Sequence, residues 1–188
     1  MVCTGNTCRS PMAEGLLRHT LAERGLDVGV SSAGLLTEGQ PATDTAVDTL
    51  AERGIDLDGH RSRRISPEVL GRADLIVGMT REHVREAAVM RPDLYERAFT
   101  LKELVRRGRR TGPRPAGEPV GAWLSRLASG RAPRDHLGAS ALDDVADPVG
   151  QGERVYEQTA DELEDLTTAL VDLLWPELTA DVTGRATG

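Results

Sequence analysis

Apolar and polar positions along the chain repeat with two alternating spacings. Helical spacing, in which apolar residues return to one face every three to four positions, predicts helices over residues 11–24, 43–54, 66–72, 80–90 and 151–174. Short apolar or alternating runs predict strands over residues 28–32, 73–77 and 98–101. Strands that alternate with helices in this way are typical of an α/β domain with a parallel sheet.

Local signals mark the ends of several predicted helices. Ser10-Pro11 and Ser66-Pro67 each combine a hydroxyl N-cap with a proline at the first helical position. Gly25 lies where a left-handed C-terminal cap belongs. We therefore expect the first helix to begin at Pro11, with Ser10 as its cap.

Residues 106–140 differ in composition from the rest of the chain. They contain a dense run of arginines and several prolines, which we interpret as an insertion or long loop. One short amphipathic helix is expected inside it, carried by Val120, Trp123, Leu124 and Leu127. The length of 188 residues is that of one domain. We expect this domain over residues 1–175, followed by a flexible tail over residues 176–188.

The charge balance and the hydropathy limit the possible partners. The chain has 23 Lys and Arg against 30 Asp and Glu, a net charge of −7, which disfavours nucleic acid as a partner. No apolar run approaches the roughly 18 residues that cross a bilayer, and no basic segment followed by an apolar one opens the chain. We expect a cytoplasmic protein with no membrane partner.

The candidate chemistry lies at the N-terminus, where five residues separate Cys3 from Arg9. This segment joins the end of a strand to the start of a helix. Successive backbone N–H groups in such a loop form a concave anion site, the helix N-terminus adds a positive dipole end, and a guanidinium matches phosphate oxygens. The pattern predicts a site for a tetrahedral oxyanion, which we expect to be bound by Thr4, Gly5, Asn6, Thr7, Cys8, Arg9 and Ser10.

Cys3 is the candidate nucleophile of this site. Taken alone, a cysteine is most often a small core residue, but a helix N-terminus and a guanidinium favour the thiolate over the thiol. Ser10 can point its hydroxyl at the Cys3 sulfur. Gly5 lets the backbone turn close to the anion, and Asn6 tolerates a positive φ. The two cysteines of the chain are too few and too close together for a secreted disulfide scaffold.

Residues 2–13, VCTGNTCRSPMA, resemble the phosphate-binding loop of the low-molecular-weight protein tyrosine phosphatase family. Further segments follow in that family's order: SAG at 32–34, HRSR at 60–63, ADLIVGMT at 73–80 and DPVG at 147–150. The resemblance implies a three-layer α/β fold, in which helices flank a four-stranded parallel sheet and the phosphate-binding loop follows the first strand. It also implies a phosphorylated protein or peptide as substrate, a cysteinyl-phosphate intermediate, no cofactor and no metal.

The reaction needs a proton for the leaving group and then a base for water, and one carboxylate can serve both steps. The resemblance assigns this role to Asp147, which precedes Pro148. Judged without the family, Asp147 could equally shape a turn before the proline or cap the last helix. Asp143 and Asp144 are the alternative acids.

Two residues match family positions that support the loop. Ser32 and His60 match positions that brace Asn6, although a histidine in a polar segment is often only a solvated loop residue. Cys8 either forms a protective disulfide with Cys3 on oxidation or packs as a thiol. No comparable match exists for the other histidines, His19, His83 and His136.

The residues around the cleft bear on the substrate. Phosphotyrosine-specific members usually place aromatic residues at positions that in this chain hold Val149, Gly150, Leu35 and Leu36. Trp123 is the aromatic residue that could reach the cleft from residues 106–140. Thr7, together with residues 99–103, resembles the protein-arginine phosphatase branch, and its hydroxyl could bond a guanidinium. We expect phosphotyrosine by family default, with protein-arginine phosphatase as the alternative.

Two other functions use the same kind of site. Arsenate reduction needs a further cysteine away from the loop, which this chain lacks, or an external thiol. A phosphate-binding module that has lost catalysis does not need an intact Cys3, Arg9 and Asp147, so their presence favours an enzyme.

The first strand is expected to be short. Only Met1 and Val2 precede Cys3, whereas family members normally begin with several apolar residues. A central strand this short leaves neighbouring backbone groups unpaired, so we expect weak support for the loop that follows it.

Overall fold

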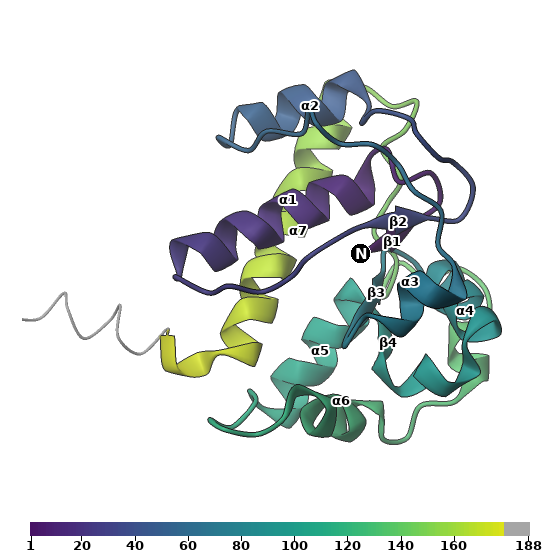
Figure 1. The fold of residues 1–188 in the computed structure, drawn as a ribbon, viewed down its shortest axis with the longest axis vertical. Coiled ribbons are helices and arrows are strands. Elements are labelled where there is room, and N and C mark those ends of the chain that lie inside the picture. Colours follow the sequence, from purple (N-terminus) through teal and green to yellow (C-terminus); the bar gives the residue numbers. More distant parts are fainter. Residues whose placement is uncertain (179–188) are drawn as a thin grey trace, which may run out of the picture.

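The computed structural model describes residues 1–178 and places one parallel sheet between layers of helices (Figure 1). Its four strands follow the order β2-β1-β3-β4, and every neighbouring pair is parallel. The strands are β1 (Val2–Cys3), β2 (Ala33–Gly34), β3 (Ile76–Gly78) and β4 (Ala98–Thr100). The predicted fold class is confirmed. The predicted tail falls, from residue 179 on, outside the described residues.

Seven α-helices and two 3-10 helices in the described residues surround this sheet. They are α1 (Arg9–Glu23), α2 (Asp44–Ala51), α3 (Pro67–Gly71), α4 (Arg81–Met90), η1 (Pro92–Arg97), α5 (Leu101–Thr111), α6 (Val120–Ala128), η2 (Pro133–His136) and α7 (Glu153–Leu174). The long helix α7 packs against α1, α2 and α5. Over residues 1–178, no helix combines the length and apolarity that a bilayer crossing requires.

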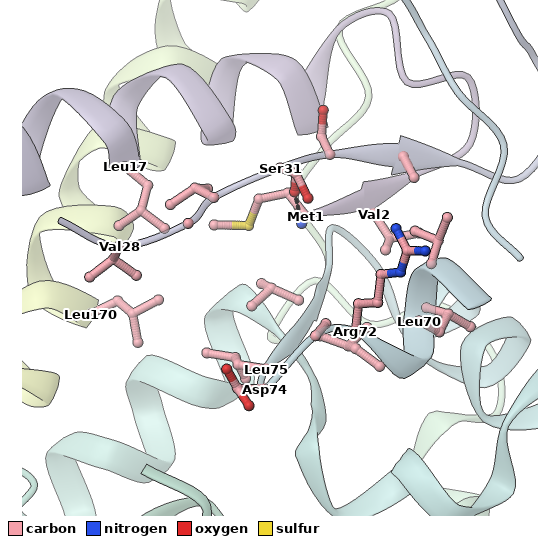
Figure 2. Close-up of a pocket in the computed structure, with 18 of the residues that line it drawn as sticks. Met1, Val2, Leu17, Val28, Ser31, Leu70, Arg72, Asp74, Leu75 and Leu170 are labelled. Carbon is pink, nitrogen blue, oxygen red and sulfur yellow. Dashed lines mark hydrogen bonds between the residues drawn. The ribbon is translucent and has the colours of Figure 1, made fainter. Parts of the chain in front are cut away.

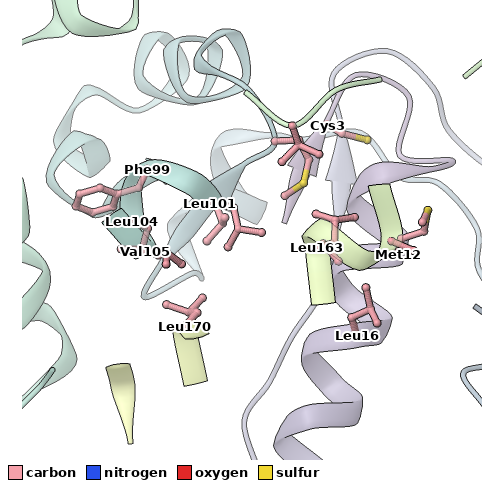
Figure 3. Close-up of a cluster of buried hydrophobic side chains, with 14 of the residues drawn as sticks. Cys3, Met12, Leu16, Phe99, Leu101, Leu104, Val105, Leu163 and Leu170 are labelled. Carbon is pink, nitrogen blue, oxygen red and sulfur yellow. The ribbon is translucent and has the colours of Figure 1, made fainter. Parts of the chain in front are cut away.

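Successive strand residues are buried in two different cores. Cys3, Val77 and Phe99 point to one side of the sheet and pack with α1, α5 and α7 (Figure 3). Ile76 and Ala98 point to the other side and pack with α3 and α4. This alternation, buried on both faces, is what a parallel sheet covered by helices requires.

The first strand has only two residues but pairs on both sides. Val2 is in register with Ala33 of β2 and with Gly78 of β3. The Met1 ammonium donates a hydrogen bond to the carbonyl of Ser31 at 2.7 Å. The expectation of a poorly supported first strand is therefore wrong at its carboxyl end, from which the loop leaves.

The strand predicted over residues 28–32 does not form. Because β1 covers only Val2–Cys3, the strand residues opposite it are Ala33–Gly34, and the preceding segment has no ladder partner. Val30 instead packs partly buried against Leu21 and Val171, on α1 and α7. Val28, the other apolar residue of the alternating pattern, is 38% exposed.

Residues 106–140 do not form one long loop. Residues 106–111 complete α5, α6 is the predicted amphipathic helix, and η2 follows it. Trp123 of α6 is fully buried, and its Nε1 donates to the carbonyl of Gly112 at 3.2 Å. The prediction that Trp123 could cover the cleft is wrong, because the apolar face of α6 is turned toward the core.

A buried ionic cluster fixes the segment that follows α6. The Arg131 side chain is fully buried, donates to Glu103 at 3.0 Å and lies over the Phe99 ring at 4.0 Å. Burial disfavours the ionised form of Glu103, but hydrogen bonding to His136 and the charges of Arg131 and Arg107 outweigh it and lower the pKa of Glu103 to about 2. These basic residues of the 106–140 segment therefore hold its fold together.

A cavity of about 310 Å³ lies beside Met1 (Figure 2). Its lining is largely apolar and includes Leu17, Val28, Leu75 and Leu170. Burial here lowers the pKa of the Met1 amino group from 8.0 to about 6. Neither the nucleophile nor the arginine of the predicted site lines this cavity.

Candidate active site

The loop of residues 4–8 leaves the carboxyl end of β1 and leads directly into α1. Cys3 is buried, and its Sγ lies 3.0 Å from the Ser10 hydroxyl and accepts the backbone N–H of Asn6 at 3.1 Å. Cys8 occupies the N-cap position of α1. The thiol therefore lies beside the first turn of a helix, where the helix dipole favours negative charge.

The direction of the Ser10 hydroxyl follows from its partners. The Asn6 side-chain amide donates to Ser10 Oγ at 2.9 Å and to Ser32 Oγ at 2.7 Å. Because Ser10 Oγ accepts this bond, its own hydrogen is left for the Cys3 sulfur. A thiolate at Cys3 thus accepts two hydrogen bonds, one from Ser10 and one from the Asn6 backbone.

The predicted start of the first helix is wrong by two residues. The helix α1 begins at Arg9 rather than at Pro11, and Ser10 lies inside it instead of capping it. The proline is tolerated there because the first-turn N–H that it lacks would have no partner within the helix. The Ser10 hydroxyl is consequently free to bind the Cys3 sulfur.

Asn6 is the centre of the support under the loop. It is fully buried at a φ of 52°, and its side-chain oxygen accepts the backbone N–H of Arg63 at 3.0 Å. His60 Nε2 donates to its carbonyl at 2.7 Å. A Cβ at Gly34 would lie 2.8 Å from the Asn6 nitrogen, so a glycine is needed at that point. Ser32 and His60 thus contact Asn6 as expected, and the Arg63 contact was missed.

Arg9 and Asp147 meet at the mouth of the loop. Arg9 Nη2 lies 2.5 Å from Asp147 Oδ2, and Arg9 Nη1 donates to the carbonyl of Val145 at 3.2 Å. The Arg9 side chain is 6% exposed and that of Asp147 is 47% exposed. The structure therefore pairs a buried cation, on the first residue of α1, with a solvent-accessible carboxylate.

The alternative acids are held in other contacts. Asp143 is buried and pairs with Arg81 at 2.6 Å and with Arg106 at 2.5 Å. Asp144 accepts the backbone N–H of Arg81 at 2.8 Å, at the first residue of α4. Both carboxylates fasten the segment that leads to Asp147 onto α4, which leaves Asp147 as the carboxylate at the mouth.

His83 is a residue near the loop that the sequence reasoning missed. It is buried in the first turn of α4, and its Nε2 lies 3.0 Å from the Thr4 hydroxyl. Burial, followed by the positive charge of Arg9, lowers the pKa of His83 to about 4, with Asp144 opposing. A sequence signal existed in the Thr80-x-x-His83 spacing at a helix start, but it does not predict the contact with Thr4.

Cys8, the last residue of the loop, is a packed thiol. It is buried in the core, and its Sγ lies 3.8 Å from the sulfur of Met12. Burial, with the charges of Asp147 and Cys3, raises the pKa of Cys8 to about 12. Both cysteines are free. Cys8 is therefore protonated at neutral pH, and of the two thiols it is the one unsuited to attack a phosphoryl group.

The predicted rim of the cleft has exposed aliphatic residues instead of aromatic ones. Leu36 is 66% exposed and Val149 is 52% exposed, while Leu35 is half-buried. All five aromatic residues of the chain lie within the described part: Tyr95, Phe99, Trp123, Tyr156 and Trp175. Of these, Tyr156 is buried and its side chain interacts with the Cys8 thiol of the loop. The four predicted rim positions therefore offer no aromatic surface.

A family model described as "Low molecular weight phosphotyrosine protein phosphatase" matches residues 1–112, more than half of the chain. This chain belongs to the low molecular weight phosphatase family. The matched residues include the whole loop from Cys3 to Arg9, together with Ser32, His60 and His83. They end at α5, before the segment that carries Asp147.

Relatives of this family member cover nearly its whole length. The Protein-arginine-phosphatase of Bacillus subtilis is 36% identical over 174 residues, which are 92% of this chain and 93% of the relative. A solved low molecular weight protein tyrosine phosphatase from T. tengcongensis is 35% identical, with a TM-score of 0.70 over 92% of this chain and 96% of that one. A YwlE arginine phosphatase mutant with a phosphorylated active-site serine is 34% identical, with a TM-score of 0.68 over 91% of both chains.

Membership defines the enzyme class. The chain is a hydrolase, a cysteine-based protein phosphatase of the low molecular weight type, and phosphorylated proteins are its substrate class. Within residues 1–178 no three His, Cys, Asp or Glu side chains are grouped as a metal site would require.

Proposed function

We propose that this phosphatase hydrolyses phosphoarginine in proteins or peptides, through a cysteinyl-phosphate intermediate on Cys3. The similarity to the Bacillus subtilis Protein-arginine-phosphatase carries this proposal, because it extends over 92% of the chain and so beyond the residues that the family model matches. Thr7 is the feature of the site that favours the same substrate.

The first step transfers the phosphoryl group to the cysteine. The Cys3 thiolate, held by Ser10 and the Asn6 N–H, attacks phosphorus, so that an S–P bond forms while the P–N bond to the arginine side chain breaks. Asp147 gives its proton to the leaving nitrogen, which departs as part of an arginine guanidinium. Arg9 and the loop N–H groups bind the phosphoryl oxygens.

The second step releases phosphate. Asp147, now a carboxylate, takes a proton from a water molecule whose oxygen attacks phosphorus. The S–P bond breaks, Cys3 returns as a thiolate, and inorganic phosphate leaves. The phosphorylated active-site serine of the related YwlE mutant is consistent with a covalent intermediate at the position that Cys3 occupies here.

Thr7 supports the choice of phosphoarginine. Its hydroxyl lies near Gly5 across the loop, because a Cβ on that glycine would be 3.3 Å from Thr7 Oγ1. The Thr7 carbonyl accepts the backbone N–H of Thr43 at 2.8 Å, which anchors this half of the loop to the start of α2. The Thr7 hydroxyl can accept a hydrogen bond from an N–H of a guanidinium, whereas a phenyl ring has no N–H to donate.

The test uses two peptides of one sequence that carry either phosphoarginine or phosphotyrosine at the same position. We expect kcat/KM for phosphate release to be at least about tenfold higher for the phosphoarginine peptide, a difference that one contact can supply. A higher value for the phosphotyrosine peptide would reject phosphoarginine as the preferred substrate and leave the cysteine mechanism in place. Phosphate release from p-nitrophenyl phosphate but from neither peptide would reject both peptide assignments.

Phosphotyrosine is the second candidate substrate. The solved T. tengcongensis relative is described as a tyrosine phosphatase and covers as much of this chain as the arginine phosphatases do. The exposed side chains of Leu36 and Val149 could also pack against a phenol ring. Arsenate reduction is less favoured, because the chain has no cysteine other than Cys3 and the buried Cys8.

A further inference from the structure

The first turn of α4 joins the two halves of the site. His83 in this turn reaches Thr4, the residue after the nucleophile, while the backbone N–H of Arg81 is bound by Asp144 of the segment that carries Asp147. A Cβ at Gly78 would lie 3.0 Å from the His83 Cβ, so the glycine is what lets this turn approach the end of β3. The position of His83 is therefore fixed by backbone on two sides.

The hydrogen-bond partners of His83 define its tautomer. The backbone N–H of Thr80 donates to Nδ1 at 3.0 Å, so Nδ1 carries no hydrogen. In the neutral ring the hydrogen is then on Nε2, which donates to Thr4 Oγ1 at 3.0 Å. The lowered pKa of His83, caused by burial and by Arg9, keeps the ring neutral at physiological pH. The imidazole thus acts as a fixed donor to Thr4 and adds no charge to the anion site.

Thr4 is held from both sides. Its carbonyl accepts the backbone N–H groups of Leu35 and Leu36 at 2.9 and 3.0 Å, beyond the end of β2. Its hydroxyl is held by His83 on the α4 side. These contacts fix the residue that links Cys3 to Gly5, and with it the direction of the first peptide groups of the anion loop.

We propose that His83 is a positioning residue of the phosphatase reaction, which acts through Thr4 to hold the start of the anion loop in its binding geometry. The proposal deepens the proposed function and shares its site. The two ring nitrogens then have different roles. Nδ1 accepts the Thr80 N–H and closes the first turn of α4, and Nε2 donates to Thr4 and orders the loop.

Two matched variants divide these tasks. In His83→Gln the side-chain amide can reach the place of Nε2 and keep the donor to Thr4, while the Nδ1 acceptor is lost. In His83→Asn the shorter side chain keeps an acceptor near the place of Nδ1 for the Thr80 N–H and loses the reach to Thr4. A purely structural role predicts that activity follows thermal stability, whereas a positioning role predicts that the two separate.

The experiment measures Tm, vanadate affinity and kcat/KM on p-nitrophenyl phosphate for the full chain and both variants. We expect His83→Asn to lose about tenfold in vanadate affinity and in kcat/KM at nearly unchanged Tm, the size of one lost hydrogen bond. His83→Gln should keep both within about threefold while its Tm falls. The proposal is overturned if His83→Asn binds vanadate as wild type does, or if His83→Gln loses as much affinity as His83→Asn.

A double-mutant cycle provides the second test. In the Thr4→Val background the acceptor is gone, so His83→Asn should cause no further loss of vanadate affinity. Additive losses would show that His83 does not act through Thr4. Because vanadate binding does not require turnover, this test is independent of the proposed function. If the proposed function is wrong, the wild-type protein will bind vanadate but release no phosphate from any substrate.

Discussion

Arg9 Nη2 lies 2.5 Å from Asp147 Oδ2, a contact that links residues 138 positions apart in the sequence. The buried guanidinium thereby holds the segment of Asp147 over the loop that begins at Cys3. A phosphoryl group in the loop would share the donors of Arg9 with this carboxylate. The arginine thus has two tasks, to bind the anion and to place the acid.

Arg9→Lys tests both tasks. An ammonium cannot replace the two-pronged guanidinium, so we expect vanadate affinity and kcat to fall together, with kcat lower by about 10²-fold or more. Arg18→Lys is the matched control on the same helix, since the polar partners of Arg18 among residues 1–178 are Glu14 and the Val30 carbonyl, both at the exposed surface. Near-normal kinetics for Arg9→Lys would place Arg9 outside the anion site.

Asp147→Asn tests the acid. We expect turnover of esters with poor leaving groups to fall by roughly 10² to 10⁴, and turnover of esters with good leaving groups to fall less, because the latter need no proton. Inorganic phosphate should bind at least as tightly as to wild type, since the amide does not repel it. The measurement is the slope of log kcat against leaving-group pKa.

Asp143→Asn is the control for this prediction. Asp143 is buried between Arg81 and Arg106, so the substitution should lower Tm by leaving these two charges poorly matched, with little change in the leaving-group slope. A steeper slope for Asp143→Asn than for Asp147→Asn would mean that Asp143 is the acid.

Thr7→Ile tests the substrate. The isoleucine removes the hydroxyl and adds apolar bulk at the loop, which favours a flat ring over a guanidinium. We expect the ratio of phosphoarginine to phosphotyrosine turnover to fall about tenfold, or about 1.4 kcal/mol. Thr7→Ser keeps the hydroxyl and should keep the ratio. Equal effects of Thr7→Ile on both peptides would reduce Thr7 to a residue that only shapes the loop.

His83 should make stability depend on pH in a defined window. Its ordinary pKa of 6.5 is lowered to about 4 in the folded protein by burial and by Arg9, against the effect of Asp144. The unfolded chain therefore takes up the proton first as the pH falls, so this contribution is complete above pH 6.5 and is lost toward pH 4. The pKa shift of Glu103 acts with the same sign, since its contribution is complete above 4.5 and is lost toward about pH 2, and that of the Met1 amino group is complete above 8.0 and is lost toward about pH 6.

Urea unfolding across this range checks the assignment. The free energy of unfolding of wild type should fall more steeply between pH 6.5 and 4 than that of His83→Gln, because a glutamine at position 83 has no titratable group. Parallel curves for the two proteins would mean that His83 titrates normally and is not held neutral by its surroundings.

The local part of the site could be predicted from the sequence, because its geometry is set by neighbours in the chain. Cys3, Asn6 and Arg9 lie within one loop and one helix turn, so their spacing predicts that they belong to one anion site. The error at Ser10 shows the limit of this reasoning. Its serine-proline signal is typical of a helix cap, yet the hydroxyl is taken by Asn6 and Cys3.

Contacts between distant segments required the structure. His83 lies 79 positions from Thr4, and a histidine three residues after a threonine at a helix start does not indicate what its second nitrogen contacts. Trp123 has correct helical spacing, but spacing gives the apolar face and not the direction in which it is turned. The strand expected at Val28 and Val30 failed for a similar reason, since pairing depends on the length of β1.

We expect Cys3 to be the nucleophile of this protein phosphatase. The most direct measurement is phosphate release from a phosphoarginine or phosphotyrosine peptide by wild type, Cys3→Ser and Cys8→Ser, with vanadate binding measured on the same samples. We predict rapid release by wild type, substantial release by Cys8→Ser, and no catalytic turnover by Cys3→Ser although it still binds vanadate. Turnover by Cys3→Ser near the wild-type rate would show that Cys3 is not the nucleophile.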